Sequence, residues 1–124
     1  MATIDITADT FNDVINDNDV VIIDFWAEWC GPCKAFAPVY EQVSAHYDNI
    51  VFGKIDTETE QELAAHFQIR SIPTLMVFRE KVVLFANPGM LSAGQLEEVI
   101  GKVMEADMAE VHAEIARQQA EQSD

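Results

Sequence analysis

The pattern of apolar and polar positions at the start of the chain predicts a strand followed by a helix. Ile4 and Ile6 alternate with polar neighbours, which is typical of a short strand. A helix should then run to about residue 16, with Asp9 or Thr10 as its N-terminal cap. The residues expected on its inner side are Phe11, Val14 and Ile15.

Two further pairs of strand and helix follow the first. Residues 20–26 are almost continuously apolar, as in a strand buried on both faces of a parallel sheet. Apolar residues then recur at steps of three and four over residues 30–47, which predicts a long amphipathic helix. Its stripe consists of Ala35, Phe36, Val39, Tyr40, Val43 and Tyr47. Residues 50–56 predict the next strand, and residues 58–67 a helix with Leu63, Ala64 and Phe67 buried.

The second half of the chain changes from parallel to antiparallel pairing. Residues 74–79 and 82–87 predict two strands too close together for a crossover, so they should form an antiparallel hairpin. The turn, Glu80-Lys81, lacks the Asn-Gly or Asp-Gly pair that tight hairpins favour. Ser92 and Gln95 form a capping box ahead of a helix that buries Leu96, Val99, Ile100 and Val103. The predicted fold class is α/β, with a central mixed five-stranded sheet flanked by helices.

The last twenty residues differ in character from the rest. They are rich in Ala, Glu and Gln, contain no helix breaker, and continue a thin apolar stripe at Met104, Met108, Val111 and Ile115. We therefore divide the chain into one domain, residues 1–104, and an acidic helical extension, residues 105–124. We interpret the extension as a solvated helix, with a surface for a partner or for self-association as the alternative.

Composition and charge narrow the possible functions. The 124 residues suit one domain, and 49% hydrophobic residues exclude global disorder. Twenty-two acidic against seven basic residues give a net charge of −15, so nucleic acid and anionic membranes are poor partners. The N-terminus has no basic region followed by an apolar stretch, and no apolar run is long enough to span a bilayer. We expect a cytoplasmic protein that is a monomer.

The chain's two cysteines, Cys30 and Cys33, lie where a strand pattern gives way to a helix pattern. A helix start offers unpaired N–H groups and the positive end of the dipole, which favour a thiolate, so Cys30 should be an exposed nucleophile. Residues three apart on a helix are close enough for a disulfide. Such a small loop would stabilise the fold by only about 2 kcal/mol. Redox turnover explains the pair better than a structural role.

The sequence Trp-Cys-Gly-Pro-Cys-Lys, which begins at Trp29 and follows an apolar strand, resembles the active site of the thioredoxin family. The resemblance runs from about Thr3 to about Met104, and it includes Asp24, Lys54 and the segment Arg70-Ser71-Ile72-Pro73-Thr74. It implies the thioredoxin fold and a protein-disulfide reductase in which Cys30 attacks and Cys33 resolves. It also implies no bound cofactor and an electron supply from NADPH through a flavin-dependent thioredoxin reductase. The implied substrates are disulfides of reductive enzymes, peroxide-defence enzymes and other oxidised cytosolic proteins.

Asp24 is the one charge in a strand suited to full burial, and burial raises the pKa of a carboxyl group. The resemblance implies that Asp24 lies beneath the dithiol and exchanges protons with Cys33 through water. It also implies that Lys54, on the neighbouring strand, moderates the ionisation of Asp24. The alternative is a structural carboxylate bonded to the backbone.

Pro73 precedes a strand and cannot donate a ladder hydrogen bond, so it marks a turn or an edge. An ordinary turn proline is one interpretation. The resemblance implies instead a cis Ile72–Pro73 peptide that faces the dithiol and pairs with an extended substrate. The implied substrate groove consists of Trp29, Gly31, Pro32, Ile72, Pro73, Gly89 and Met90. Pro88 stands where many members of the family carry a β-branched residue, which changes that side of the groove.

Other chemistries fit the cysteine pair less well. A zinc site needs two more ligands, and His46, His66 and His112 lack the spacing of a zinc finger. Covalent haem requires a histidine directly after Cys33, where Lys34 stands. Disulfide oxidases and isomerases share the fold but usually have a histidine in place of Gly31 or Pro32. A non-enzymatic binding module with the same fold is the alternative from another functional class.

Overall fold

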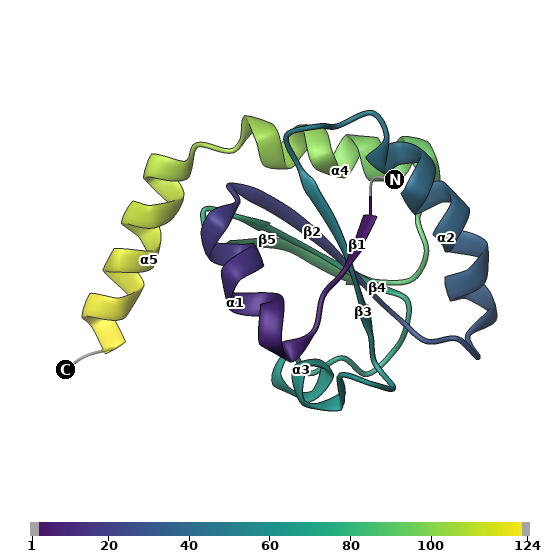
Figure 1. The fold of residues 1–124 in the computed structure, drawn as a ribbon. Helices are drawn as coiled ribbons and strands as arrows, with labels where there is room; N and C mark the ends of the chain where they lie inside the picture. Colours follow the sequence, from purple (N-terminus) through teal and green to yellow (C-terminus); the bar gives the residue numbers. More distant parts are fainter. Residues whose placement is uncertain (1–2, 123–124) are drawn as a thin grey trace.

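A computed structural model describes residues 3–122 of the chain as a five-stranded mixed sheet with helices on both faces (Figure 1). The strands are β1 (Thr3–Asp5), β2 (Val20–Trp26), β3 (Val51–Asp56), β4 (Thr74–Arg79) and β5 (Val82–Pro88). The helices are α1 (Ala8–Asp17), α2 (Gly31–Ser44), α3 (Gln61–His66), α4 (Ala93–Glu105) and α5 (Met108–Gln122). The predicted fold class is confirmed.

The sheet is ordered β1-β3-β2-β4-β5, which places β2 at its centre. β2 and β1 both run parallel to β3, whereas β4 is antiparallel to β2 and β5 is antiparallel to β4. In β2, every residue up to Phe25 is buried, because helices cover both of its faces. The predicted hairpin and the predicted bounds of β2 are therefore correct.

Alternate residues of β2 enter two separate cores. Val20 and Ile22 pack with buried residues of α2 and α4, which include Phe36, Tyr40, Val43, Leu96, Ile100 and Val103. Val21, Ile23 and Phe25 pack on the opposite face, against Phe11, Val14 and Ile15 of α1 and Leu63 and Phe67 near α3. The inward residues predicted for α1 and α4 thus occupy the core.

Two predicted helix starts are wrong because nearby side chains accept hydrogen bonds from the backbone at other positions than expected. α1 begins after Thr7 and not at Asp9 or Thr10: the Thr10 hydroxyl accepts a hydrogen bond from the Thr7 N–H at 3.0 Å. α3 begins at Gln61, three residues later than expected, because the Asp56 carboxylate accepts the Glu58 N–H at 2.9 Å and the residues that follow form a turn.

Helix α2 is shorter than predicted and presents a slightly different face. It ends at Ser44, whose hydroxyl donates to the Glu41 carbonyl at 2.6 Å, and Tyr47 lies beyond it. Ala35, which the apolar stripe predicts to be buried, is exposed, and Cys33 is buried instead. The inner face of α2 is therefore formed by Cys33, Phe36, Tyr40, Val43 and Ser44.

The hairpin between β4 and β5 has the geometry of a type I′ turn without its usual residues. Glu80 has φ 51° and Lys81 has φ 68°, so both adopt the left-handed conformation that Asn and Gly favour. The strand pairing shifts by one residue between Val77 and Phe78. The capping box of α4 is as predicted, with Ser92 N–H to Gln95 Oε1 at 2.9 Å and Gln95 N–H to Ser92 Oγ at 3.1 Å.

The C-terminal segment is helical, but it is not an uninterrupted continuation of α4. The helix breaks at Ala106 and Asp107, and the Asp107 carboxylate accepts the Glu110 N–H at 3.2 Å, which caps α5. The Arg79 guanidinium donates to the carbonyls of Val103, Met104 and Ala106 at 2.9, 3.2 and 3.0 Å, which closes the end of α4.

The first turn of α5 packs against the rest of the protein. Met108 is 6% exposed, whereas Met104 is 38% exposed. Val111 and Ile115 are half-buried, and His112 Nε2 lies 2.8 Å from Glu80 Oε1. The expectation of a simply solvated extension is thus wrong for this turn. Positions 123–124 of the predicted extension lie outside the described residues, and across residues 3–122 no helix is long and apolar enough to cross a bilayer.

Candidate active site

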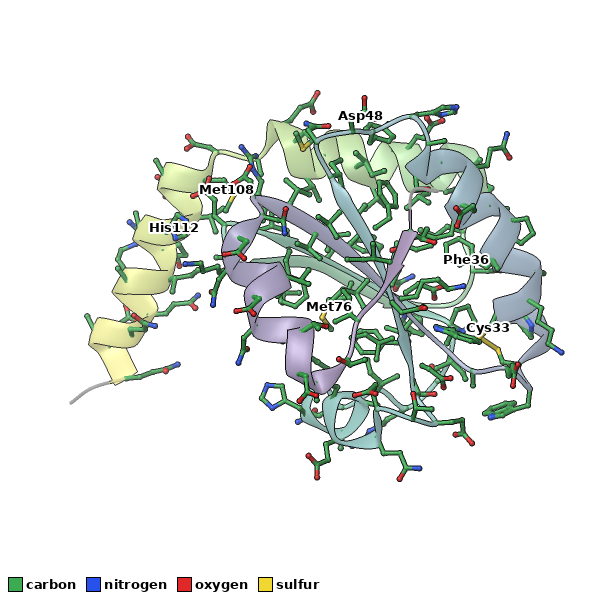
Figure 2. The ribbon with its side chains drawn as sticks, viewed as in Figure 1. Cys33, Phe36, Asp48, Met76, Met108 and His112 are labelled. Carbon is green, nitrogen blue, oxygen red and sulfur yellow. A yellow bond between two sulfur atoms is a disulfide. The ribbon has the colours of Figure 1, made fainter. Side chains whose placement is uncertain are left out.

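The two cysteines lie at the N-terminus of α2, directly after the buried strand β2. Cys30 is the N-cap residue, and Cys33 lies in the first turn. A disulfide joins them, with their Cα atoms 5.2 Å apart (Figure 2). Pro32 stands at the start of the helix, where its missing N–H costs nothing. The local sequence thus places two thiols where a helix can bring them together.

Both cysteines are buried, which corrects the expectation of an exposed Cys30. Each is 3% exposed, and they cluster with Ala27, Trp26 and Ile72. What distinguishes the two is hydrogen bonding, because the Cys33 N–H donates to the Cys30 sulfur at 3.1 Å. An N–H donor at a helix start stabilises a thiolate on Cys30 when the pair is reduced.

The segment before β4 lies beside the disulfide. The Ile72–Pro73 peptide is cis, and the Ile72 carbonyl oxygen is 3.7 Å from the Cys30 sulfur. Gly89 adopts φ 102°, which suits glycine, and its N–H donates to the Pro73 carbonyl at 2.8 Å. The structure therefore brings together Cys30, Ile72, Pro73 and Gly89, which are far apart in the sequence.

Exposed residues surround this buried centre. Trp29 is 68% exposed and Met90 is 45% exposed, while Gly31 and Pro32 are also on the surface. Pro88 pairs with Thr74 at the end of the β4–β5 ladder. A hollow beside Trp29 is lined by Glu28, Trp29, Lys34, Asp56, Glu58 and Thr59, so its charged groups are mainly acidic.

Asp24 is a buried carboxyl group without a hydrogen-bond partner among residues 3–122. It is 1% exposed, and neither of its oxygens accepts a bond from the described residues. The alternative of a carboxylate bonded to the backbone is therefore wrong. Burial raises the pKa of Asp24 from 3.8 to about 7, and the ammonium group of Lys54 lowers it in part. Such a group can hold or release a proton near neutral pH.

Lys54 and Trp26 complete the surroundings of Asp24. Lys54 pairs with Asp24 in the ladder between β2 and β3, and its Nζ lies 4.7 Å from the centre of the Trp26 ring. The buried Trp26 Nε1 has no partner in the described part of the chain. Trp26 is a residue of the site that no sequence motif marks; the only signal for it is the strand face that it shares with Asp24.

The histidines are separate from this centre and from one another. His46 Nδ1 lies 3.6 Å from Glu97, His66 contacts Phe67 edge to face with ring centres 4.8 Å apart, and His112 contacts Glu80. Within residues 3–122, no group of three or more His, Cys, Asp or Glu side chains could hold a metal ion.

Comparisons with known proteins agree with this geometry. The thioredoxin family model matches residues 2–119. A putative thioredoxin 2 from Streptomyces coelicolor is 51% identical over 120 residues, which cover 97% of this chain and 90% of the relative. A thioredoxin from Buchnera aphidicola is 38% identical over 99 residues, covering 78% of this chain and 92% of the relative. The Streptomyces match leaves at most four residues of this chain outside, so it includes most of α5.

Solved structures show the same fold. A mutant thioredoxin from Halobacterium salinarum superposes with a TM-score of 0.78 at 32% identity, covering 84% of this chain and 92% of that chain. Thioredoxin f from spinach chloroplast superposes with a TM-score of 0.77 at 31% identity, covering 84% and 95%.

Proposed function

The chain belongs to the thioredoxin family, and we propose on this premise that Cys30, Cys33 and Asp24 divide the steps of its reaction among them. The protein is an oxidoreductase that reduces protein disulfides by dithiol–disulfide exchange. The observation that carries this conclusion is the Cys30–Cys33 disulfide at the N-terminus of α2. It is the oxidised product of such a reaction.

The reaction has two exchanges. The Cys30 thiolate attacks one sulfur of the substrate disulfide, the other substrate sulfur leaves as a thiolate and takes up a proton, and a mixed disulfide remains. The Cys33 thiolate then attacks the Cys30 sulfur, and the second substrate sulfur leaves. Two electrons have passed from the dithiol to the substrate, and Cys30 is joined to Cys33.

The assignment of Cys30 as the attacking residue rests on its surroundings. Its sulfur accepts the Cys33 N–H at 3.1 Å and lies at the positive end of α2, and both features favour the thiolate. Cys33 lies in the first turn of the helix and donates this bond through its backbone. Cys33 is therefore the resolving residue in our proposal.

Asp24 accepts the proton of Cys33 through water when Cys33 must attack. Its pKa of about 7 suits this role, because a base works best with a pKa near the working pH. Lys54 acts as a positioning residue that limits how far burial raises the pKa of Asp24. The substrate backbone pairs beside Ile72 and Pro73, with Trp29, Gly31, Pro32 and Gly89 around it.

Electrons reach the protein from NADPH through a flavin-dependent thioredoxin reductase, as the family implies. Its substrates are then disulfides of reductive and peroxide-defence enzymes in the cytoplasm, where the protein works as a monomer. The decisive experiment is insulin reduction coupled to a thioredoxin reductase, with NADPH oxidation as the readout. Turnover should require both cysteines. A protein that binds oxidised substrates but shows no cysteine-dependent turnover would be a binding module instead.

A further inference from the structure

A groove that the redox reaction does not use runs between strand β5 and helix α5. We call it the edge groove, and it has a volume of about 550 Å³. The β5 wall consists of Val82, Val83 and Leu84, and the α5 side consists of Asp107, Glu110, Val111, Glu114, Ile115 and Gln118. A second hollow, lined by Leu84, Phe85, Val99, Lys102, Val103 and Ala106, adjoins it through Leu84.

The β5 wall of the edge groove is an edge of the sheet. β5 is last in the strand order, and among the described residues no strand pairs with its outer side. An unpaired edge offers backbone N–H and C=O groups to an added strand. Its side chains are apolar, and Val83 is 42% exposed. This wall therefore fits an extended chain better than a helix.

Helix α5 forms the opposite wall without closing over β5. It is held near its start by the buried Met108 and by the contact of His112 with Glu80 at 2.8 Å (Figure 2). Val111 and Ile115, one and two turns further along, are only half-buried and line the groove. An apolar strip thus stays open between β5 and α5.

The charge of the edge groove selects its occupant. Three carboxylates line it, from Asp107, Glu110 and Glu114, and none of the described residues that line it is basic. Arg117 offsets one of these charges by pairing with Glu110 at 3.1 Å and with Glu114. Because the chain also carries a net charge of −15, a second copy would be repelled and a basic segment attracted.

We propose that the edge groove binds an extended segment of a partner protein in which apolar and basic residues alternate. The segment adds to β5 as a strand, because the outer edge of β5 pairs with no other strand among the described residues. The apolar set contacts Val83, Val111 and Ile115, and the basic set reaches the carboxylates of Asp107, Glu110 and Glu114 with its long side chains. The partner is thus recognised by shape, backbone and charge together.

The edge groove lies away from the disulfide. Val82 pairs with Arg79, and Arg79 pairs with Val20 at the start of β2, whereas Cys30 follows the other end of β2. In Figure 1, α5 lies on the opposite side of the protein from α2. A partner in the edge groove therefore leaves the dithiol free, so this binding is independent of the proposed reaction steps.

The test uses a fluorescein-labelled peptide of alternating valine and lysine that contains no cysteine, and the full-length oxidised protein. Anisotropy should show binding that weakens as salt is added. Val83→Lys should weaken binding by about tenfold, because the new ammonium group meets the lysines of the peptide. Gln42→Lys, on the exposed side of α2, gives the same net charge and should leave binding close to that of the wild type. Equal losses in both variants would overturn the proposal.

A second pair of variants tests the carboxylates. Glu110→Gln and Glu62→Gln each remove one charge from the first turn of a helix, but only Glu110 lines the edge groove. Glu110→Gln should weaken binding severalfold, and Glu62→Gln should not. Backbone amide shifts in NMR should change along β5 and α5. Changes confined to the surroundings of Trp29, or no binding at all, would contradict the proposal.

Two measurements separate this proposal from its alternatives. Sedimentation equilibrium should give a monomer for wild type and Val83→Lys, whereas a dimer that Val83→Lys dissociates would make a second copy the occupant. Insulin reduction by Val83→Lys should equal that of the wild type, because Val83 lies outside the reaction centre. Loss of insulin reduction in the wild type would contradict the proposed function, while the peptide measurements would still decide on the edge groove.

Discussion

Asp24 and Lys54 are partners in the parallel ladder between β2 and β3, yet the carboxylate of Asp24 accepts no hydrogen bond from Lys54. The Lys54 ammonium instead lies 4.7 Å from the centre of the Trp26 ring. It therefore acts on Asp24 as a nearby charge and not as a bonded partner. Burial dominates, so the pKa of Asp24 remains about 7.

Replacing Lys54 by methionine should raise the pKa of Asp24 further, because the ammonium lowers it in the wild type. Titration of the Asp24 carboxyl carbon by NMR, in the oxidised protein, measures this directly. Lys54→Arg keeps the positive charge and should leave the pKa close to its wild-type value. A pKa in Lys54→Met at or below that of the wild type would show that Lys54 does not act by its charge.

Asp24→Asn should make the protein more stable at pH 8. The unfolded group titrates near 3.8 and the folded one near 7, so between these pH values only the native state holds the proton. The contribution of Asp24 to the free energy of unfolding therefore falls by roughly 3 to 5 kcal/mol as pH rises from about 4 to about 7. The asparagine side chain carries no charge that burial would penalise at pH 8. Its amide would be buried without hydrogen-bond partners, however, which costs part of the benefit. The expected increase in the free energy of unfolding at pH 8 is therefore roughly 2 to 4 kcal/mol.

Urea unfolding of wild type and Asp24→Asn at pH 5 and pH 8 tests this expectation. The difference between the two proteins is the relevant quantity, because other carboxylates contribute to the pH dependence of both. Turnover of insulin should fall in the variant as resolution by Cys33 slows. A variant that is no more stable at pH 8, with unchanged turnover, would mean that Asp24 has only a structural role.

Single cysteine variants should separate the two roles. Cys30→Ser should abolish exchange, and Cys33→Ser should still attack but accumulate mixed disulfides, visible on a non-reducing gel. Alkylation of the reduced wild type at limiting reagent should modify Cys30 first, because the Cys33 N–H stabilises its thiolate. Faster alkylation of Cys33 would reverse the assignment.

The anchoring of α5 can be tested with two methionines of different burial. Met108→Ser should lower the free energy of unfolding by about 2 kcal/mol, because it removes an apolar side chain that is only 6% exposed. Met104→Ser changes a residue that is already 38% exposed and should have a much smaller effect. Chemical denaturation measures the free energy of unfolding of both variants. Insulin reduction by both variants should proceed at the wild-type rate. Equal effects would restore the interpretation of a solvated extension.

The turn at Glu80 and Lys81 offers a stabilising change. Lys81→Gly should raise the free energy of unfolding by about 0.5 kcal/mol, because glycine tolerates the φ of 68° that costs other residues energy. Lys81→Ala removes the same side chain but keeps a Cβ, so it should give no gain. Thermal unfolding compares the three proteins, and a gain in Lys81→Ala as large as in Lys81→Gly would rule out backbone conformation as the cause.

Several features set by local sequence were predictable, although local bonds to Thr10 and Asp56 changed the starts of α1 and α3. The apolar run over residues 20–26 predicted both ends of β2. The change from a strand pattern to a helix pattern after this run predicted that Cys30 lies at the start of a helix. Ser92 and Gln95 likewise marked the start of α4 through neighbouring backbone groups.

Features set by distant residues were not predictable. The burial of Cys30 depends on Ile72, which lies 42 positions away in the chain. The end of α4 depends on Arg79, which reaches the Val103 carbonyl across 24 positions, and no breaker in the sequence signals the change to α5. The unpartnered state of Asp24 depends on where the Lys54 side chain lies, which the strand pattern cannot reveal.

The position of α5 has a practical consequence for attaching this protein to a solid support. α5 begins near Arg79, at the end of β2 that lies opposite to Cys30. The two ends of β2 are about 20 Å apart. Coupling to a resin or an electrode through the last turn of α5 would orient the disulfide toward the solution. Coupling through Lys34, which lies in the hollow beside Trp29, would cover it.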